Sequence, residues 1–143
     1  MARLSGRAGA RVLGPWSLGV VLGALTAWPA VAGHGPDWTV LTIKAAYVKS
    51  LLDAGERVVL IDLRPPREYQ KGHVPGARSL PLAELRSRYQ DIPRAGLVVL
   101  YCACPREDLQ SAYLFLRGQS LRNLAVMDEG FPAWVAKGYP LEP

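Results

Sequence analysis

The chain has 143 residues, half of them hydrophobic, which is enough for one hydrophobic core and hardly for two. Its net charge of +5 comes from 17 Lys and Arg against 12 Asp and Glu, and the basic residues are scattered without interleaved aromatics. Nucleic-acid binding surfaces concentrate positive charge in a patch, so this pattern argues against nucleic acid as a partner. We expect one small domain whose charges are mostly solvated.

Residues 1–32 have the three-part layout of a secretory signal. Three arginines precede an uncharged stretch over 12–31, and Ala30-Val31-Ala32 supplies a small-x-small cleavage pattern. Removing this segment leaves 14 basic and 12 acidic residues, so the precursor pI of 9.5 says little about partners. We expect a periplasmic or secreted protein that begins near Gly33 and contacts the membrane transiently through the signal. The alternative is a chain anchored by an uncleaved N-terminal segment.

Apolar periodicity and turn residues predict alternating strands and helices over the domain at residues 39–141. In chain order we expect a helix capped by Thr42 and stopped by Gly55, a strand over 57–63, a short helix around 67–70, a strand near 78–80, a helix over 82–89, a strand over 97–101, a helix ended by Gly118, a strand over 124–127 and a helix over 131–137. The first helix is expected to bury the face formed by Ile43, Ala46, Tyr47, Ser50, Leu51 and Ala54, and the helix ended by Gly118 that of Leu109, Ala112, Tyr113 and Leu116. This order predicts an α/β fold whose parallel sheet is covered on both faces, with the strongly apolar strand 97–101 at its centre.

That strand ends on Cys102 and turns directly into a helix. A thiol at this position lies where backbone N–H groups and the positive end of a helix dipole converge, which favours its thiolate. In open parallel sheets the ligand crevice lies at the carboxyl ends of the strands, which favours a catalytic interpretation. The alternative is two cysteines that merely pack at a strand end.

Cys104 is the only other cysteine, two positions along. A disulfide between them would close almost no loop, add little stability and be easily reduced, so its value would be redox chemistry. The only histidines are His34 and His73 and there is no second cysteine pair, so we expect no metal site.

Several separated motifs occur in the order typical of one known family. They are Ile61-Asp62-Leu63-Arg64, Glu68-Tyr69, Gly72-His73-Val74-Pro75-Gly76-Ala77, Val99-Leu100-Tyr101-Cys102, Gly130-Phe131-Pro132-Ala133-Trp134 and Gly138-Tyr139-Pro140. Together they resemble the rhodanese-like family over about Thr39 to Leu141. The resemblance implies a single α/β rhodanese-like domain, with a five-stranded parallel sheet flanked by helices on both faces and no metal or organic cofactor.

The resemblance further implies a sulfurtransferase in which Cys102 cycles between thiol and persulfide, and the leader over 1–32 implies that it is exported. Cys102 would take sulfur from a small thiosulfate-like donor and pass it to a thiol or cyanide-like acceptor, or to a protein acceptor. Cys104 would resolve the Cys102 persulfide or sulfenic acid through a labile disulfide, receive the sulfur, or only line the loop. Two other functions stay open: a non-catalytic rhodanese module that binds a protein or sulfur compound, and a thiol-disulfide oxidoreductase that uses the cysteine pair.

The active-site loop departs from the family's usual Cys, x, x, Gly, x, Arg. Here it reads Cys102, Ala103, Cys104, Pro105, Arg106, Glu107 and Asp108. The form Tyr-Cys-x-Cys-Pro-x-Glu resembles a variant in rhodanese domains of bacterial membrane-linked sulfur proteins. Phosphatases and arsenate reductases of this fold need an arginine where Asp108 stands, and a carboxylate there would repel a dianion.

Other charged residues near the motifs have mainly structural interpretations. Asp62 and Arg64 are expected to form a structural ion pair, and His73 to fix its loop by hydrogen bonding. Glu107 and Asp108 are expected to complement the helix N-terminus and face away from the sulfur. Arg106 is either a partner for a thiosulfate sulfonate or a surface residue. Three further assignments complete the interpretation: Trp134 in the core, Trp38 as a cap at the domain edge, and Glu129 in place of the first glycine of the family's usual Gly-Gly pair.

Overall fold

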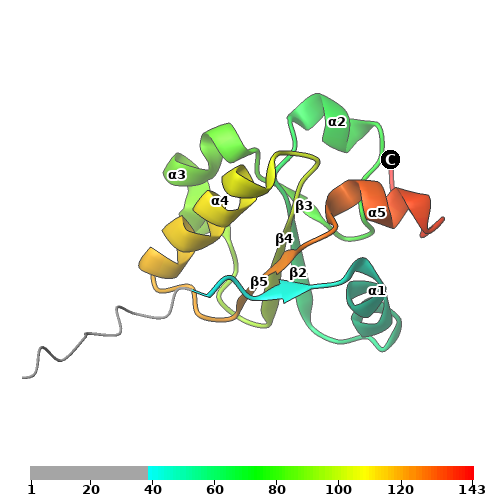
Figure 1. Ribbon diagram of the computed structural model, residues 1–143, viewed down its shortest axis with the longest axis horizontal. Coiled ribbons are helices and arrows are strands. Elements are labelled where there is room, and N and C mark those ends of the chain that lie inside the picture. The colour runs from blue at the N-terminus through cyan, green and yellow to red at the C-terminus, as the bar shows by residue number, and fades with distance from the viewer. Residues whose placement is uncertain (1–38) are drawn as a thin grey trace, which may run out of the picture. The chain divides into compact units, whose positions relative to one another are not determined.

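A computed structural model describes residues 39–143 (Figure 1). The expected leader over 1–32, His34 and Trp38 lie outside the described residues. The strands are β1 (Thr42–Ile43), β2 (Val58–Asp62), β3 (Arg78–Ser79), β4 (Leu97–Tyr101) and β5 (Leu124–Met127). The α-helices are α1 (Ala45–Asp53), α2 (Pro66–Gln70), α3 (Leu85–Arg88), α4 (Arg106–Gly118) and α5 (Gly130–Ala136), and the two 3-10 helices are η1 (Leu82–Glu84) and η2 (Tyr89–Asp91).

The strands form one five-stranded sheet in the order β1-β5-β4-β2-β3, and every pairing is parallel. β4 lies at the centre, as its apolar sequence predicts, and pairs with β2 along its whole length from Val58↔Leu97 to Asp62↔Tyr101. The predicted α/β class and parallel sheet are therefore confirmed. Because all strands run the same way, the loops that follow them meet at one edge of the sheet.

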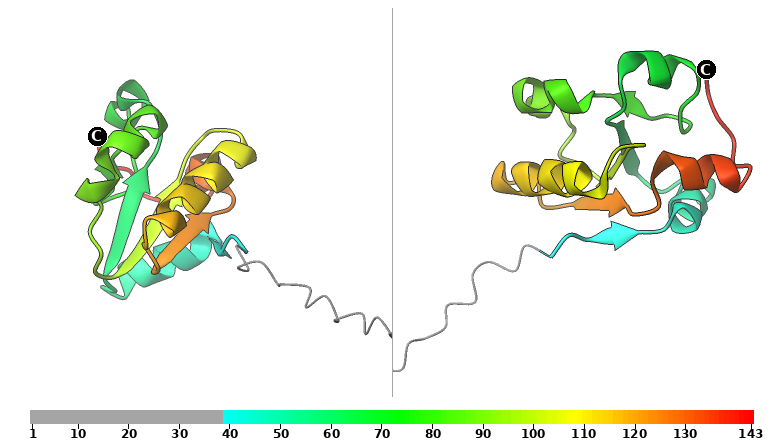
Figure 2. Two further views of the ribbon diagram at one scale, coloured as in Figure 1. Left: turned by 90° about the vertical axis from the view of Figure 1, so that its left-hand side faces the viewer. Right: turned by 45° about the horizontal axis from the view of Figure 1, so that its top comes forward.

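Side-chain alternation along the strands divides the core into two layers. On one face, Ile61 and Leu100 pack in the cluster that contains buried residues of α3 and α4. On the other face, Leu60 and Val99 pack in the cluster that contains Trp134 of α5 and the buried residues of α1. In Figure 1 and in the right-hand view of Figure 2, α3 and α4 lie on one side of the strands and α1 and α5 on the other. Both faces of the sheet are covered, and Trp134 is fully buried as predicted.

The prediction for the first helix was wrong in its start and in its buried face. Thr42 does not cap it, because Thr42 and Ile43 form β1 and pair with β5, so α1 begins at Ala45. With this start the buried residues are Ala45 and Val48. Most of the expected face is exposed: Ala46, Tyr47, Ser50 and Ala54.

Two other boundaries also differ from expectation. The helix expected over 82–89 is a succession of η1, α3 and η2. Gly118 is the last residue of α4, and the left-handed conformation after the helix belongs to Ser120, with a φ of 65°. The apolar pattern located these segments but did not determine how each helix begins and ends.

Candidate active site

Cys102 lies at the carboxyl end of the central strand, as expected from the sequence. It follows β4 directly, and only Ala103, Cys104 and Pro105 separate it from α4. Its residue surface is 5% exposed. Among the described residues, none accepts a hydrogen bond from the backbone N–H of Ala103 or Cys104. The loop therefore presents backbone donors at the N-terminal end of a 13-residue helix.

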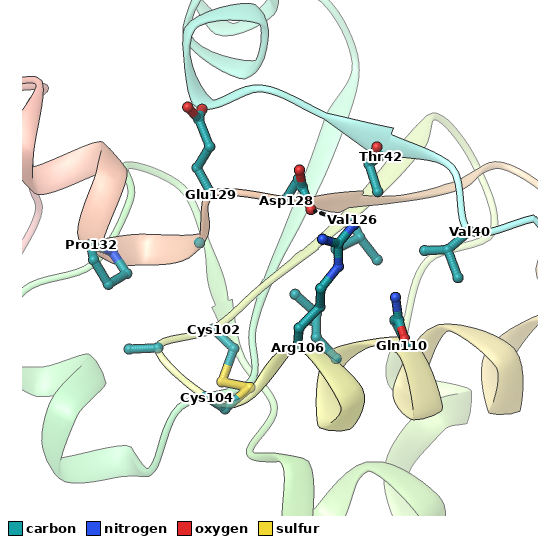
Figure 3. A pocket seen from close by; sticks show the side chains of 13 residues that line it. Val40, Thr42, Cys102, Cys104, Arg106, Gln110, Val126, Asp128, Glu129 and Pro132 are labelled. Atoms are coloured by element: carbon teal, nitrogen blue, oxygen red, sulfur yellow. Dashed lines mark ion pairs between the residues drawn. A yellow bond between two sulfur atoms is a disulfide. The ribbon is translucent and has the colours of Figure 1, made fainter.

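Cys102 and Cys104 are joined by a disulfide in the structure (Figure 3). Their Cα atoms are 5.3 Å apart, within the usual range of about 4.4–6.8 Å for disulfides. Neither cysteine is free, and both line the same two pockets. The loop thus brings the two sulfur atoms together.

The start of α5 fixes the backbone of Cys102. The Phe131 N–H donates a hydrogen bond of 2.9 Å to the carbonyl oxygen of Cys102. Gly130 makes this approach possible, because its φ is +64° and a Cβ built on it would stand 2.5 Å from that oxygen. Any larger residue at position 130 would push against the backbone of the loop.

The predicted ion pair between Asp62 and Arg64 is present and buried. Arg64 donates to the Asp62 carboxylate from its backbone N–H at 2.9 Å, from Nε at 3.0 Å and from Nη2 at 2.6 Å. Nη2 also donates to the carbonyl oxygen of Gly72 at 2.8 Å. The guanidinium lies 3.5 Å from the ring centre of Phe131. The ion pair therefore holds Arg64 against Phe131, whose N–H donates to the Cys102 carbonyl.

His73 lies away from the sulfur and ties the end of the chain to its own loop. Its ring stacks on Tyr69 with centroids 3.7 Å apart, and Nδ1 is 3.2 Å from the Tyr69 carbonyl oxygen. Its backbone N–H and C=O both pair with Glu142. His73 lines neither of the two pockets that contain Cys102. This geometry agrees with the predicted role in fixing the loop.

Tyr101 is buried beside the site and stays protonated. Burial, followed by the charge of Asp62, raises the pKa of its phenol well above the ordinary value. Its oxygen accepts a hydrogen bond of 3.2 Å from the Val74 N–H. Its ring stacks on Phe131 with centroids 6.0 Å apart. Tyr101 therefore contacts both Val74 and Phe131, the residue whose N–H binds the carbonyl of Cys102.

A small pocket of about 280 Å³, lined by both charged and apolar side chains, lies on one side of the cysteine loop (Figure 3). Arg106 lines it, and its Nη2 is 3.2 Å from Oδ1 of Asp128, which also lines it. The Nζ of Lys44 is 3.6 Å from the other oxygen of the same carboxylate. Arg106 is thus a cation beside the cysteines whose charge is partly balanced by Asp128.

A larger pocket of about 700 Å³ lies against the same loop, formed mainly by apolar side chains. Its lining comes from the loop after β2, the loop before η1, the cysteine loop and α5: Leu63, Arg64, Pro65, Pro66, Glu68, Pro81, Leu82, Ala83, Glu84, Cys102, Ala103, Cys104 and Phe131. Its volume lies within the range of small-molecule sites, about 300–1,000 Å³. The cysteine pair therefore lines both a small pocket that contains charged side chains and a larger, mainly apolar pocket.

Glu107 and Asp108 lie in the first turn of α4, and Pro105 is its N-cap. Neither acidic residue lines the two pockets that contain Cys102. This placement is in keeping with carboxylates that complement the helix N-terminus and face away from the sulfur.

Glu129 has a structural role that the sequence did not reveal. Its Oε2 accepts a hydrogen bond of 3.1 Å from the Ala45 N–H at the start of α1. The N-cap residue of that helix, Lys44, makes no capping hydrogen bond with its side chain. Glu129, which replaces the family's usual glycine, therefore caps α1, a helix distant in the sequence. Gly130 is the residue of this turn that has a positive φ.

Sequence reasoning also missed Asp128 and the part that Phe131 plays. Phe131 was visible as a member of a motif, but its contact with Cys102 joins residues 29 positions apart in the chain. Asp128 carried no motif signal. Among residues 39–143, no group of three or more His, Cys, Asp or Glu side chains is arranged to hold a metal ion. In the same part of the chain, no helix is long and apolar enough to cross a membrane.

Comparison with known proteins identifies the family of the fold. A model of the Rhodanese-like domain matches residues 44–137, which include every strand after β1 and the cysteine loop. The chain belongs to the rhodanese-like domain family. The five-stranded parallel sheet that the resemblance implies is present in the structure.

Several rhodanese-like relatives are named sulfurtransferases. The chain is 33% identical over 94 residues to thiosulfate sulfurtransferase GlpE of Pseudoalteromonas translucida, covering 66% of this chain and 88% of GlpE. It is also 33% identical over 87 residues to a sulfurtransferase of Allochromatium vinosum, covering 60% of this chain and 79% of the relative. An HTH-type transcriptional regulator of Mycobacterium tuberculosis is 33% identical over 90 residues, 63% of this chain, but these span only 39% of the regulator.

Solved structures agree. A thiosulfate sulfurtransferase of Pseudomonas aeruginosa superimposes with a TM-score of 0.60 at 29% identity, covering 72% of this chain and 20% of the other. The Alr3790 protein of Anabaena superimposes with a TM-score of 0.63 at 28% identity, covering 70% of this chain and 79% of the other.

Proposed function

We propose that this rhodanese-like domain is a sulfurtransferase in which Cys102 carries sulfur as a persulfide. The observation that carries the proposal is the position of Cys102 at the end of β4, between two pockets. The loop N–H groups beside it donate no hydrogen bond to any described residue. Relatives named thiosulfate sulfurtransferase support the same chemistry.

The reaction starts from the reduced pair. The Cys102 thiolate attacks the outer sulfur of a thiosulfate-like donor, the donor's S–S bond breaks, and sulfite leaves with the electron pair. The persulfide anion then lies beside the N–H groups of Ala103 and Cys104. A thiol or cyanide-like acceptor attacks the outer sulfur, and the Cys102 thiolate is released. The residues of this chain supply the nucleophile and the charge stabilisation, and no cofactor enters.

The smaller pocket, which contains Arg106, is the side from which an anionic donor would approach. Arg106 offers a guanidinium there, while Asp128 beside it weakens the attraction for a dianion. The apolar pocket on the other side has room for an organic acceptor or for a loop of an acceptor protein. Donor and acceptor would then approach the same sulfur atom from different sides.

Thiol-disulfide exchange is a second candidate function, and the Cys102–Cys104 disulfide favours it. In that case the pair exchanges two electrons with an external dithiol, and neither cysteine holds a sulfane sulfur. The two functions differ in what the reduced protein does with thiosulfate, since only a sulfurtransferase takes up its outer sulfur.

The test is formation of thiocyanate from thiosulfate and cyanide by the prereduced chain. We expect activity in the wild type and in Cys104→Ser, and none in Cys102→Ser, which is the matched control because both substitutions replace sulfur by oxygen in the same loop. Loss of activity in Cys104→Ser as well would favour chemistry that requires the pair. Activity that persists in Cys102→Ser would refute the proposal.

We also propose that residues 1–32 direct export, which accounts for their arginines, apolar stretch and small-x-small pattern. The mass of the protein recovered from the periplasm or medium tests this. A mature chain that begins near Gly33 supports export with cleavage, and the full-length mass in the membrane fraction supports an uncleaved anchor.

A further inference from the structure

The disulfide places Cys104 where it can finish a reaction that Cys102 begins. We propose that Cys104 attacks the inner sulfur of the Cys102 persulfide, so that the protein releases hydrosulfide without any external acceptor. The inference rests on the proposed function, since it begins from the persulfide on Cys102. It adds an activity, reductive release of sulfane sulfur, and assigns Cys104 a catalytic role.

Cys104 lies within reach of the Cys102 sulfur. The disulfide shows that the loop conformation holding Cys102 also brings the Cys104 sulfur into bonding contact with it. Attack on the inner sulfur of a persulfide needs the same approach, because its product is this same disulfide. The Cα separation of 5.3 Å is thus already that of the product.

Cys102 is held in place, whereas Cys104 is partly accessible. The Cys102 carbonyl is fixed by the Phe131 N–H, and the residue is 5% exposed. Cys104 is half-buried and lies one residue before the N-cap of α4, where a helix N-terminus favours a thiolate. These two cysteines are the only ones in the chain, so no other thiol of the same chain competes.

The outer sulfur of the persulfide borders space into which it can leave. Both pockets are lined by Cys102, Ala103 and Cys104, with volumes of about 280 and 700 Å³. A persulfide on Cys102 therefore borders space on either side of the loop. The hydrosulfide that leaves can depart through either pocket without the cysteines moving apart.

The atoms and electrons of the overall step balance. The protein dithiol and thiosulfate give the protein disulfide, one hydrosulfide and one hydrogen sulfite. The bond between Cys102 and the outer sulfur breaks, the bond between the two cysteine sulfurs forms, and the outer sulfur leaves with the electron pair and a proton. The dithiol is oxidised by two electrons and the sulfane sulfur is reduced by two. A further cycle requires an external dithiol reductant, the class of compound that reopens such a disulfide.

The experiment is a single turnover of prereduced, full-length protein with thiosulfate under anaerobic conditions, followed by intact mass and by hydrosulfide release. We expect the wild type to end about 2 Da below its reduced mass and to release one hydrosulfide per chain. In Cys104→Ser, and in Cys104→Ala as a second variant, we expect a lasting gain of about 32 Da and no hydrosulfide. The rate of hydrosulfide release by the wild type should not depend on protein concentration, because both thiols belong to one chain.

Three outcomes separate the inference from the proposed function. If the wild type keeps the added sulfur and releases no hydrosulfide, the inference is wrong while Cys102 remains the carrier. If it loses 2 Da without a stoichiometric amount of hydrosulfide, an adventitious oxidant formed the disulfide and the inference is again wrong. If neither Cys104 variant gains sulfur, the proposed function itself fails.

Discussion

Substitution of Gly130 by alanine tests how closely α5 is fitted to the cysteine loop. A Cβ at this position would stand 2.5 Å from the Cys102 carbonyl oxygen, and the backbone has a φ of +64°. Because the obstructing atom belongs to the backbone, the clash can be relieved only by a shift of the cysteine loop or of the start of α5. Either shift would lengthen the hydrogen bond from the Phe131 N–H to Cys102.

Gly138→Ala is the matched control. Its φ is +67°, nearly the same, but a Cβ there meets nothing within 4 Å. The left-handed conformation alone costs a non-glycine residue about 1–2 kcal/mol. Crowding of a packed region adds about 1–3 kcal/mol. We therefore expect Gly138→Ala to lower the free energy of unfolding by about 1–2 kcal/mol and Gly130→Ala by about 2–5 kcal/mol.

Urea unfolding of the two variants and the wild type measures these differences. Thiocyanate formation is the second readout, and we expect Gly130→Ala to slow it severalfold while Gly138→Ala leaves it near the wild-type rate. Equal destabilisation by the two substitutions, together with equal activity, would show that the contact between Gly130 and Cys102 has no energetic consequence and would refute the reasoning.

Three further substitutions test the contacts around the site, each by urea unfolding. Asp62→Asn leaves the buried Arg64 without its partner charge and is expected to cost about 3–5 kcal/mol; a cost below 1 kcal/mol would show that the pair is replaceable. Glu129→Ala removes the acceptor of the Ala45 N–H and is expected to cost about 0.5–2 kcal/mol, most of which Glu129→Gln should restore. Tyr101→Phe tests a pH dependence, because the raised phenol pKa means that only the unfolded state ionises above about pH 10. Wild-type stability should then fall by up to about 1.4 kcal/mol per pH unit relative to Tyr101→Phe, and parallel pH profiles would contradict this.

Strands with a strong local apolar pattern were predictable from the sequence. β4 and β5 are continuous apolar runs, and the structure has them at the predicted residues. β1 was not predictable, because it is two residues long and exists only through its pairing with β5. That pairing also moves the start of α1 to Ala45, and so the predicted buried face of the helix was wrong.

The candidate site shows the same division. Cys102 and Cys104 could be proposed from a local pattern, a strand that ends on a thiol before a helix. The neighbours that complete the site are Asp128, directly after β5, and Phe131, in α5. Their closeness to the cysteine loop depends on the strand order. Glu129 replaces a usual glycine of the family, and only the structure shows the helix end that its carboxylate caps.

The most direct test of the account is the intact mass of prereduced Cys104→Ser after incubation with thiosulfate, beside Cys102→Ser treated identically. Cys104→Ser has a single thiol that cannot close the disulfide, so its mass reports only what Cys102 does. We predict a gain of about 32 Da in Cys104→Ser and none in Cys102→Ser. An unchanged mass in both variants would contradict the claim that Cys102 carries sulfur.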